Sequence, residues 1–254
     1  NIKGIVFSIY KNSVNIVILD EYNILNQGEK CFCTNTIFKI PVGEELLGRI
    51  INSKGEFIDF KKKIVIKNED FVEKIAPGVM ERESVNEPLL TGIKFIDSMI
   101  PIGKGQRELI IGDRQTGKTT IAIDTIINQK NKNVICIYTC IGQKISSLIN
   151  VINKLKKNNC LYYTIIVAAT AANSAAEQYI APYTACTIGE YFRDKGLNSL
   201  IIYDDLTKHA WSYRQISLLL RRPPGREAYP GDIFYLHSKL LERSSKVNSF
   251  FLKK

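Results

Sequence analysis

Residues 112–119 are Gly112, Asp113, Arg114, Gln115, Thr116, Gly117, Lys118 and Thr119. This stretch fits the pattern G-x-x-x-x-G-K-[ST] of a phosphate-binding loop. Glycines let such a loop fold closely around phosphate with its backbone N–H groups pointing inward. The flanking residues agree, because the apolar run 108–111 predicts a strand entering the loop and 118–129 predicts an amphipathic helix leaving it. A chance glycine-rich turn with an exposed lysine would not explain both flanks.

The last two residues of the motif have the chemistry that a nucleotide requires. A helix beginning near Lys118 directs the positive end of its dipole at an anion. We expect the Lys118 ammonium to reach the β- and γ-phosphates and the Thr119 hydroxyl to ligate Mg²⁺. The motif therefore predicts binding of ATP or ADP with Mg²⁺ as cofactor.

A phosphate loop usually works with an acid at the end of a neighbouring strand. The run 199–203 is apolar or aromatic after its first residue and ends at Asp204 and Asp205. Open α/β sheets bind ligands at this carboxyl edge. We expect Asp204 to hold the Mg²⁺ hydration shell, while Asp205 is a candidate N-cap of the next helix.

Another predicted strand, 134–141, is followed by Gly142 and Gln143. Many related ATPases have a glutamate here, which acts on the attacking water. An amide can hydrogen-bond to that water or to the γ-phosphate but cannot accept a proton at neutral pH. The sequence therefore predicts a site that holds nucleotide without hydrolysing it, and no catalytic residue is assigned.

Around the loop, strand-like and helical patterns alternate, which predicts an α/β fold with a mostly parallel sheet covered by helices on both faces. The predicted strands are 134–141, 164–168 and 199–203, and the predicted helices are 118–129, 144–156, 171–193 and 206–221. Short alternating runs in residues 1–38 predict antiparallel strands from part of a small N-terminal β-barrel, and 52–55 predicts a turn. The P-loop domain is expected over 39–254.

The composition, at 45% hydrophobic and 24% charged residues, is that of an ordinary globular protein. The net charge of +10 allows nucleic-acid binding, but the basic residues are scattered, and the cluster 61–63 is interpreted as a solvated edge. No apolar run approaches the ~20 residues of a membrane span.

The six cysteines lack a C-x-x-C pair and are interpreted as buried and reduced, and His209 and His237 are not spaced for zinc. The first residue is Asn1, so an incomplete or processed chain is expected.

Residues 41–246 resemble the α-subunit family of F-type ATP synthases almost continuously. The matching strings are PVGEELLGR at 41–49, PIGKGQRELII at 101–111, IGQK at 141–144, GEYFRD at 189–194, IIYDDL at 201–206, LLLRRPPGREAYPGD at 218–232 and LLER at 240–243. The family's first several dozen residues, its last strands, its trans-acting arginine and its helical bundle have no counterpart here. The resemblance is therefore to a fragment, with an incomplete barrel and an incomplete P-loop domain.

The resemblance implies a RecA-like P-loop fold and a regulatory, non-catalytic subunit of the complex that makes ATP from ADP and phosphate using a transmembrane proton gradient. It implies β subunits alternating with this chain in a ring, central and peripheral stalk subunits, no nucleic acid, and membrane contact only through the complex. The expected location is the cytoplasmic face of a bacterial inner membrane, with an organelle inner or thylakoid membrane as alternative. The alternative function is a Rho-type RNA translocase, against which Gln143 and the lack of an aromatic RNA-stacking motif count.

Overall fold

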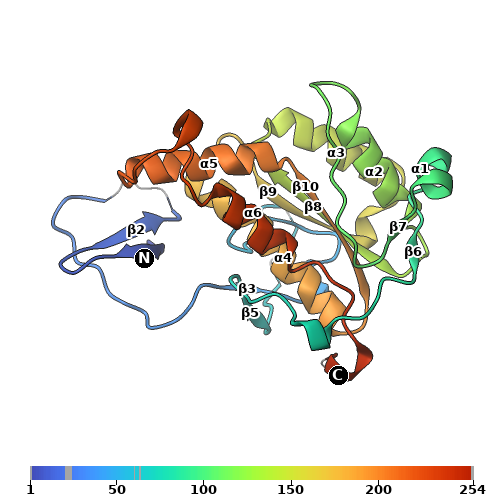
Figure 1. Ribbon diagram of the computed structural model, residues 1–254, viewed down its shortest axis with the longest axis horizontal. Helices are drawn as coiled ribbons and strands as arrows, with labels where there is room; N and C mark the ends of the chain where they lie inside the picture. The colour runs from blue at the N-terminus through green and yellow to red at the C-terminus, as the bar shows by residue number, and fades with distance from the viewer. Residues whose placement is uncertain (1, 21–24, 60, 63, 253–254) are drawn as a thin grey trace.

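The computed structural model describes residues 2–20, 25–59, 61–62 and 64–252 (Figure 1). Its centre is a four-stranded parallel sheet in the order β10-β8-β9-β4. These strands are β4 (Ile50–Ile51), β8 (Val134–Ile141), β9 (Thr164–Ala169) and β10 (Asn198–Asp204). Strands β8 and β9 are almost continuously apolar and buried, as expected for a parallel sheet covered on both faces. The predicted α/β class is confirmed.

Helices pack on both faces of this sheet and divide the core into two clusters. One cluster holds Ile137 and Ile165 with the residues of α4 (Ala175–Asp194), beside α5 (Leu206–Leu219) and α6 (Ile233–Leu241). The other holds Cys136 and Ile166 with α2 (Lys118–Asn128) and α3 (Ile145–Lys157). Successive strand residues therefore enter opposite cores, because side chains alternate across a sheet.

Helix α4 begins at Ala175, later than the predicted start at residue 171. Asn173 Oδ1 accepts hydrogen bonds of 2.8 Å from both the backbone N–H and the hydroxyl of Thr170, which holds this segment in a turn. Ser174 then serves as the N-cap and accepts a bond of 3.2 Å from Glu177 N. The side-chain oxygens of these polar residues compete with helical hydrogen bonding, so the helix starts after them.

The N-terminal region contains antiparallel strands, as predicted. Strands β1 (Gly4–Ile9) and β2 (Val14–Ile18) form one pair, and β3 (Lys39–Pro41) and β5 (Glu69–Phe71) form another. Within the described residues these are two separate two-stranded sheets, so a barrel over 1–38 stays a prediction. The predicted turn at 52–55 is confirmed by a bond of 3.1 Å from Gly55 N to Asn52 O.

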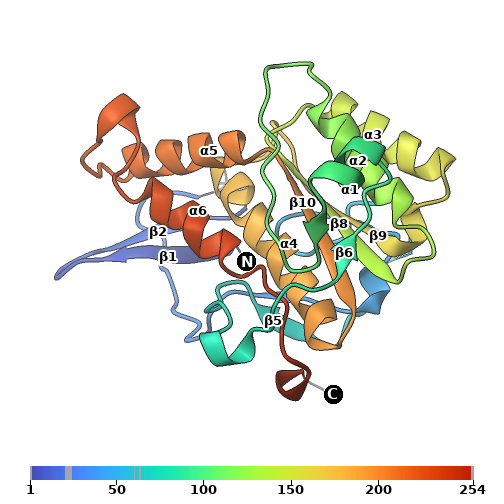
Figure 2. The same ribbon diagram turned by 45° about the vertical axis from the view of Figure 1, so that its right-hand side comes forward.

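The predicted strand at 108–111 is wrong. The chain passes from β7 (Ile102–Gly103), which pairs with β6 (Pro88–Leu89), to α2 as an uncoiled trace without an arrow (Figure 2). Leu109 and Ile111 are 70% and 83% exposed. A strand needs partners for its N–H and C=O groups. No strand pairing with 108–111 exists in the described part of the chain, so its apolar pattern alone does not produce β structure.

The remaining elements are short. They are α1 (Lys94–Met99) and the 3₁₀ helices η2 (Glu44–Leu46), η3 (Val79–Glu81), η4 (Leu161–Tyr163), η5 (Arg226–Ala228) and η6 (Ser249–Phe251). Four cysteines are buried as predicted, but Cys31 and Cys33 are exposed, because they lie in the segment 25–37, whose residues are all exposed. In the predicted solvated edge Lys61 and Lys62 are exposed, and Lys63 lies outside the described residues.

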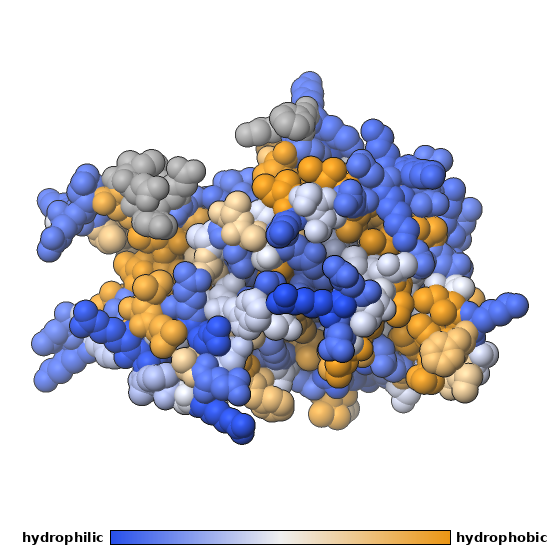
Figure 3. Space-filling view, turned by 90° about the horizontal axis from the view of Figure 1, so that it is seen from above, coloured by the Kyte–Doolittle hydropathy of each residue, from blue (hydrophilic) through white to orange (hydrophobic). Residues whose placement is uncertain are grey.

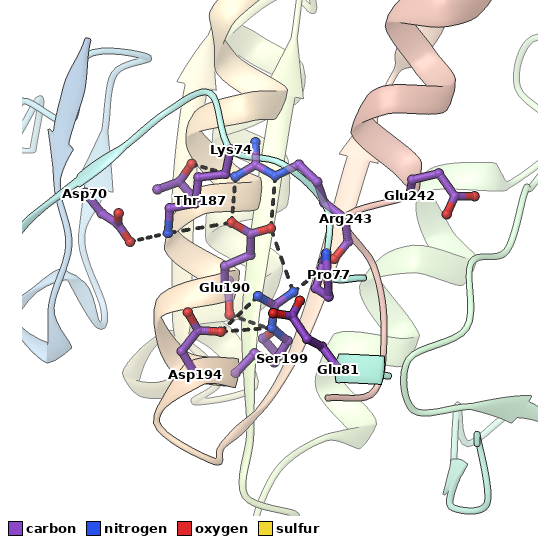
Figure 4. A network of polar contacts seen from close by, with 12 residues as sticks. Asp70, Lys74, Pro77, Glu81, Thr187, Glu190, Asp194, Ser199, Glu242 and Arg243 are labelled. Atoms are coloured by element: carbon purple, nitrogen blue, oxygen red, sulfur yellow. Dashed lines mark hydrogen bonds and ion pairs between the residues drawn. The ribbon is translucent and has the colours of Figure 1, made fainter. Parts of the chain in front are cut away.

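A buried ion pair fastens the segment after α6 to the core (Figure 4). The Arg243 guanidinium donates to both Glu190 carboxylate oxygens at 2.9 and 2.6 Å, and the two side chains are 1% and 4% exposed. Arg243 also donates to Val72 O at 2.8 Å and to the Thr187 hydroxyl at 3.0 Å. Three segments far apart in sequence therefore meet at one guanidinium, and sequence reasoning did not identify it.

Candidate nucleotide-binding site

The loop 112–117 is curled upon itself immediately before α2. Gly117 has a φ of +91°, a left-handed conformation that favours glycine. A Cβ atom on Gly112 would lie 2.7 Å from Thr116 Oγ1, so a larger residue would open the loop. The Thr116 hydroxyl donates to Asp113 O at 2.8 Å and closes the turn. The backbone conformation therefore favours glycine at Gly117, whereas at Gly112 a side chain would crowd the Thr116 hydroxyl.

Lys118 is the first residue of α2, and its side chain folds back over the loop. Its ammonium donates to the carbonyl oxygens of Gly112 and, at 2.5 Å, of Asp113. The ammonium and the free N–H groups of the helix N-terminus thus lie at the same end of α2. A phosphate bound there would meet a full positive charge and the positive end of the helix dipole together.

Asp204, the last residue of β10, accepts hydrogen bonds from three side chains. Its Oδ2 accepts from the Thr119 hydroxyl at 2.8 Å and from the Tyr138 hydroxyl at 2.7 Å. Its Oδ1 accepts from Gln143 Nε2 at 2.5 Å. The structure therefore brings together Thr119, Gln143 and Asp204, which the sequence singled out separately.

Tyr138 is a site residue that sequence reasoning missed. It lies within β8 and pairs in register with Ile202, two residues before Asp204. Burial raises the pKa of its hydroxyl above the usual range, and the Asp204 carboxylate raises it further. The hydroxyl therefore stays protonated and remains a donor to that carboxylate. The available signal was a tyrosine in an otherwise aliphatic buried strand, because a buried hydroxyl usually finds a partner.

Gln143 is aimed at Asp204 by the turn that follows β8. Gly142 has a φ of +62°, and a Cβ there would lie 2.8 Å from Gln178 Oε1 and 2.9 Å from Lys208 Cβ. Its N–H donates to Ala169 O at 2.7 Å and holds the turn against the end of β9. Gly142 therefore permits a close approach that directs the Gln143 amide toward the acid.

The two aspartates at the end of β10 have different partners. Asp205 is the N-cap of α5, and its Oδ1 accepts from Lys208 N at 2.7 Å. Asp204 instead contacts α2 through the Thr119 hydroxyl. The candidate cap at Asp205 is therefore confirmed, and Asp204 is the carboxylate available to the ligand site.

The donor set fits Mg²⁺ held together with a nucleotide. Thr119 and Asp204 offer two oxygens 2.8 Å apart. Among the described residues, neither this site nor any other part of the chain contains a group of three or more His, Cys, Asp or Glu side chains that could hold a metal ion. Mg²⁺ is commonly bound through one or two protein oxygens, with waters and substrate phosphates completing the shell. The residues present therefore suit a metal that arrives with phosphate.

None of the helices in the described part of the chain combines the length and apolarity needed to cross a bilayer.

Comparison with known proteins identifies the family of this chain. Residues 92–251 match the model of the ATP synthase alpha/beta family, nucleotide-binding domain. The chain is 78% identical over 254 residues to ATP synthase subunit alpha of Carsonella ruddii, covering all of this chain and 53% of that protein. It is 59% identical over 254 residues to ATP synthase subunit alpha 1 of Nitrosospira multiformis, covering all of this chain and 50% of that protein. The chain thus spans about half the length of the curated relatives it matches. It belongs to the ATP synthase alpha/beta family, and the relatives it resembles throughout are alpha subunits.

Proposed function

We propose that this chain is the nucleotide-binding alpha subunit of an F-type ATP synthase and that the site at residues 112–119, 143 and 204 holds Mg-ATP or Mg-ADP. The observation that carries the proposal is the 2.8 Å hydrogen bond between Thr119 of α2 and Asp204, the carboxylate at the end of β10. This is the pair of oxygens that a P-loop protein uses around Mg²⁺. The bound metal ion would neutralise charge on the β- and γ-phosphates.

The site's own residues would bind and orient the nucleotide. Lys118 would exchange its carbonyl partners in the loop for phosphate oxygens, and the loop N–H groups would surround the phosphates. Tyr138 would hold the Asp204 carboxylate in place through its 2.7 Å bond. Gln143 would contact the γ-phosphate or its neighbouring water as a hydrogen-bonding group. Because an amide accepts no proton at neutral pH, the site would bind nucleotide without turning it over.

The wider function follows from the family. We infer that the full-length chain alternates with β-type subunits in a ring, contacts the central and peripheral stalks, and contributes to ATP synthesis driven by a proton gradient. The relatives named above are bacterial proteins called ATP synthase subunit alpha, which supports a peripheral location on the cytoplasmic face of a bacterial inner membrane. The scattered basic charge favours no nucleic-acid partner.

Calorimetric titration of the full-length chain with ATP, with and without Mg²⁺, tests the proposal. We expect one ATP site per chain, and its affinity for ATP should increase when Mg²⁺ is present, because Thr119 and Asp204 would then hold the metal ion that is bound to the phosphates. The same titration with a Thr119→Ala and Asp204→Asn double variant should lose the Mg²⁺ dependence. Equal affinity in both metal conditions for the unaltered chain would contradict the site assignment.

A further inference from the structure

A second concave site lies beside the nucleotide site, between α5 and the turns that follow β8 and β9. Its cavity volume is about 490 Å³, and its lining includes Gly142, Gln178, Lys208, Trp211, Arg214 and Leu218. None of these residues binds nucleotide in the function proposed above. A volume of this size falls within the range of binding pockets.

The charge of this pocket is positive. Two of its lining residues, Lys208 and Arg214, are cations, and no carboxylate lines it among the described residues. The Arg214 guanidinium donates to the backbone oxygen of Glu227 at 3.4 Å, and among the described residues the side-chain contacts of the two cations include no carboxylate. Both are nevertheless held in place, since Lys208 Nζ lies 4.3 Å from the Trp211 ring centroid and the Arg214 guanidinium 4.7 Å from that of Tyr229. The pocket therefore offers fixed positive charge without an internal counter-ion.

The pocket also has an exposed apolar wall and a fixed floor. Trp211 is 38% exposed, and Leu218 and Leu219 farther along α5 are 45% and 74% exposed. On the floor, Gln178 accepts a 3.0 Å bond from the Ser212 hydroxyl and donates to Asn173 O at 3.0 Å. Figure 3 shows apolar groups lying among strongly hydrophilic ones on one face of the molecule. Tryptophan and arginine in a preorganised pocket are typical of the residues that dominate protein interfaces.

We propose that this pocket docks an acidic segment of a neighbouring subunit. A carboxylate of that segment lies between Lys208 and Arg214, and an adjacent apolar side chain packs on Trp211 and Leu218. A free phosphate fits less well, because it would leave the exposed apolar side chains of Trp211 and Leu218 uncovered. This assignment rests on the hetero-oligomer proposed above and names where in this chain the neighbour binds.

Photo-crosslinking in the assembled complex tests the assignment. The full-length chain is co-expressed with its β-type subunit, and a photoreactive phenylalanine replaces Gln215, which also lines the pocket. The crosslinked peptide, identified by mass spectrometry, is expected to come from the neighbouring subunit and to contain Asp or Glu beside an apolar residue. Lys208→Glu with Arg214→Glu should reduce the crosslink yield at least tenfold. The matched reversals Lys130→Glu and Lys157→Glu, at exposed lysines after α2 and in α3, should leave the yield unchanged.

The outcomes separate this inference from the proposed function. A complex that assembles but crosslinks from position 215 to its own chain, to nothing, or to a peptide without a carboxylate overturns the inference alone. Loss of the crosslink on adding inorganic phosphate or ATP would identify a small-anion site and also overturn it. Failure of the chain to assemble with the β-type subunit, while nucleotide still binds, overturns both the assembly and this docking site.

Discussion

The side-chain amide of Gln143 donates to Asp204 Oδ1 at 2.5 Å, while the other oxygen of the same carboxylate accepts from Thr119 and Tyr138. An amide at position 143 is therefore compatible with an ionised acid in contact with it. A glutamate in the same place would put two carboxylates together and raise the pKa of one of them. The hydrogen bond from Gln143 to Asp204 is the contact on which the proposal of a site that binds nucleotide without hydrolysing it can be tested.

The first prediction concerns Lys118. Lys118→Ala removes a charge-assisted contact to phosphate worth roughly 1.5–3 kcal/mol, so affinity for Mg-ATP should fall about 10- to 100-fold. Titration of the full-length chain with a fluorescent ATP analogue measures the change. Lys130→Ala, at an exposed lysine just beyond α2, is the matched control and should bind normally. Unchanged affinity in Lys118→Ala would remove the role given to this ammonium.

The second prediction is that bound ATP persists uncleaved on the full-length chain without β. General-base assistance is typically worth ~10²–10⁴-fold, and Gln143 does not supply it. A single-turnover assay with radiolabelled ATP should show no cleavage over minutes, and Gln143→Ala should behave the same. Some GTPases use a glutamine to orient water, so cleavage within seconds would identify a catalytic site of that kind.

The third prediction concerns Tyr138. Tyr138→Phe removes one donor from Asp204 and should weaken nucleotide binding several-fold in Mg²⁺ while leaving metal-free binding unchanged. The loss corresponds to one net hydrogen bond of roughly 1 kcal/mol. Tyr163→Phe is the matched control, because its buried hydroxyl donates to Ile126 O at 2.8 Å, away from the site. Equal effects of the two variants on Mg²⁺ dependence would mean that Tyr138 is only structural.

The fourth prediction concerns the buried pair Arg243–Glu190. Arg243→Ala removes both hydrogen bonds to the buried Glu190 carboxylate and leaves it with only the longer contacts to Lys74 and Arg193, at 3.8 and 3.7 Å. Breaking a buried pair in this way should lower the free energy of unfolding by about 3 kcal/mol. Urea denaturation of the full-length chain measures it. Replacing both residues, as Arg243→Met with Glu190→Leu, should restore most of the loss. A double variant no more stable than Arg243→Ala would show that the contacts to Val72 and Thr187 matter more than the ion pair.

The fifth prediction concerns pH and the two histidines. His209 Nδ1 lies 3.1 Å from His237 Nε2, and His209 Nε2 lies 3.0 Å from Tyr179 O. Burial, together with the neighbouring His237, lowers the pKa of His209 from 6.5 to about 3, so the folded state holds it neutral. Below pH 6.5 the unfolded chain gains a proton that the folded chain does not. Stability is therefore complete above pH 6.5 and falls as the pH decreases toward 3.

The slope expected from one such proton is about 1.4 kcal/mol per pH unit. Urea denaturation of the full-length chain at pH 7.5, 6 and 5 measures it, in parallel with His209→Gln, which keeps hydrogen-bonding capacity but does not titrate. The variant should show a flatter pH dependence over this range. Parallel curves for the two proteins would show that His209 is not the titrating group.

Much of the site could be predicted from the sequence because its signals are local. The spacing of glycines, Lys118 and Thr119 specifies a loop within eight residues, and the apolar run before Asp204 specifies a strand end. The alternation of strand and helix patterns predicted the parallel sheet, because two parallel neighbouring strands must be joined by a crossover, which is usually a helix. These features depend on neighbours along the chain, which a sequence displays directly.

Other features depended on residues that are distant in sequence, and only the tertiary structure decided them. The run 108–111 has the composition of a strand but pairs with no described strand. A β-strand forms only where a neighbouring strand supplies hydrogen-bonding partners for its backbone. The contacts of Tyr138 with Asp204 and of Arg243 with Glu190 follow from strand register and helix packing. His209 and His237, which are not spaced for zinc along the chain, meet because α5 and α6 place them together. Local patterns specify which elements form, whereas the partners of a buried polar group are selected by long-range packing, where an unsatisfied group is costly.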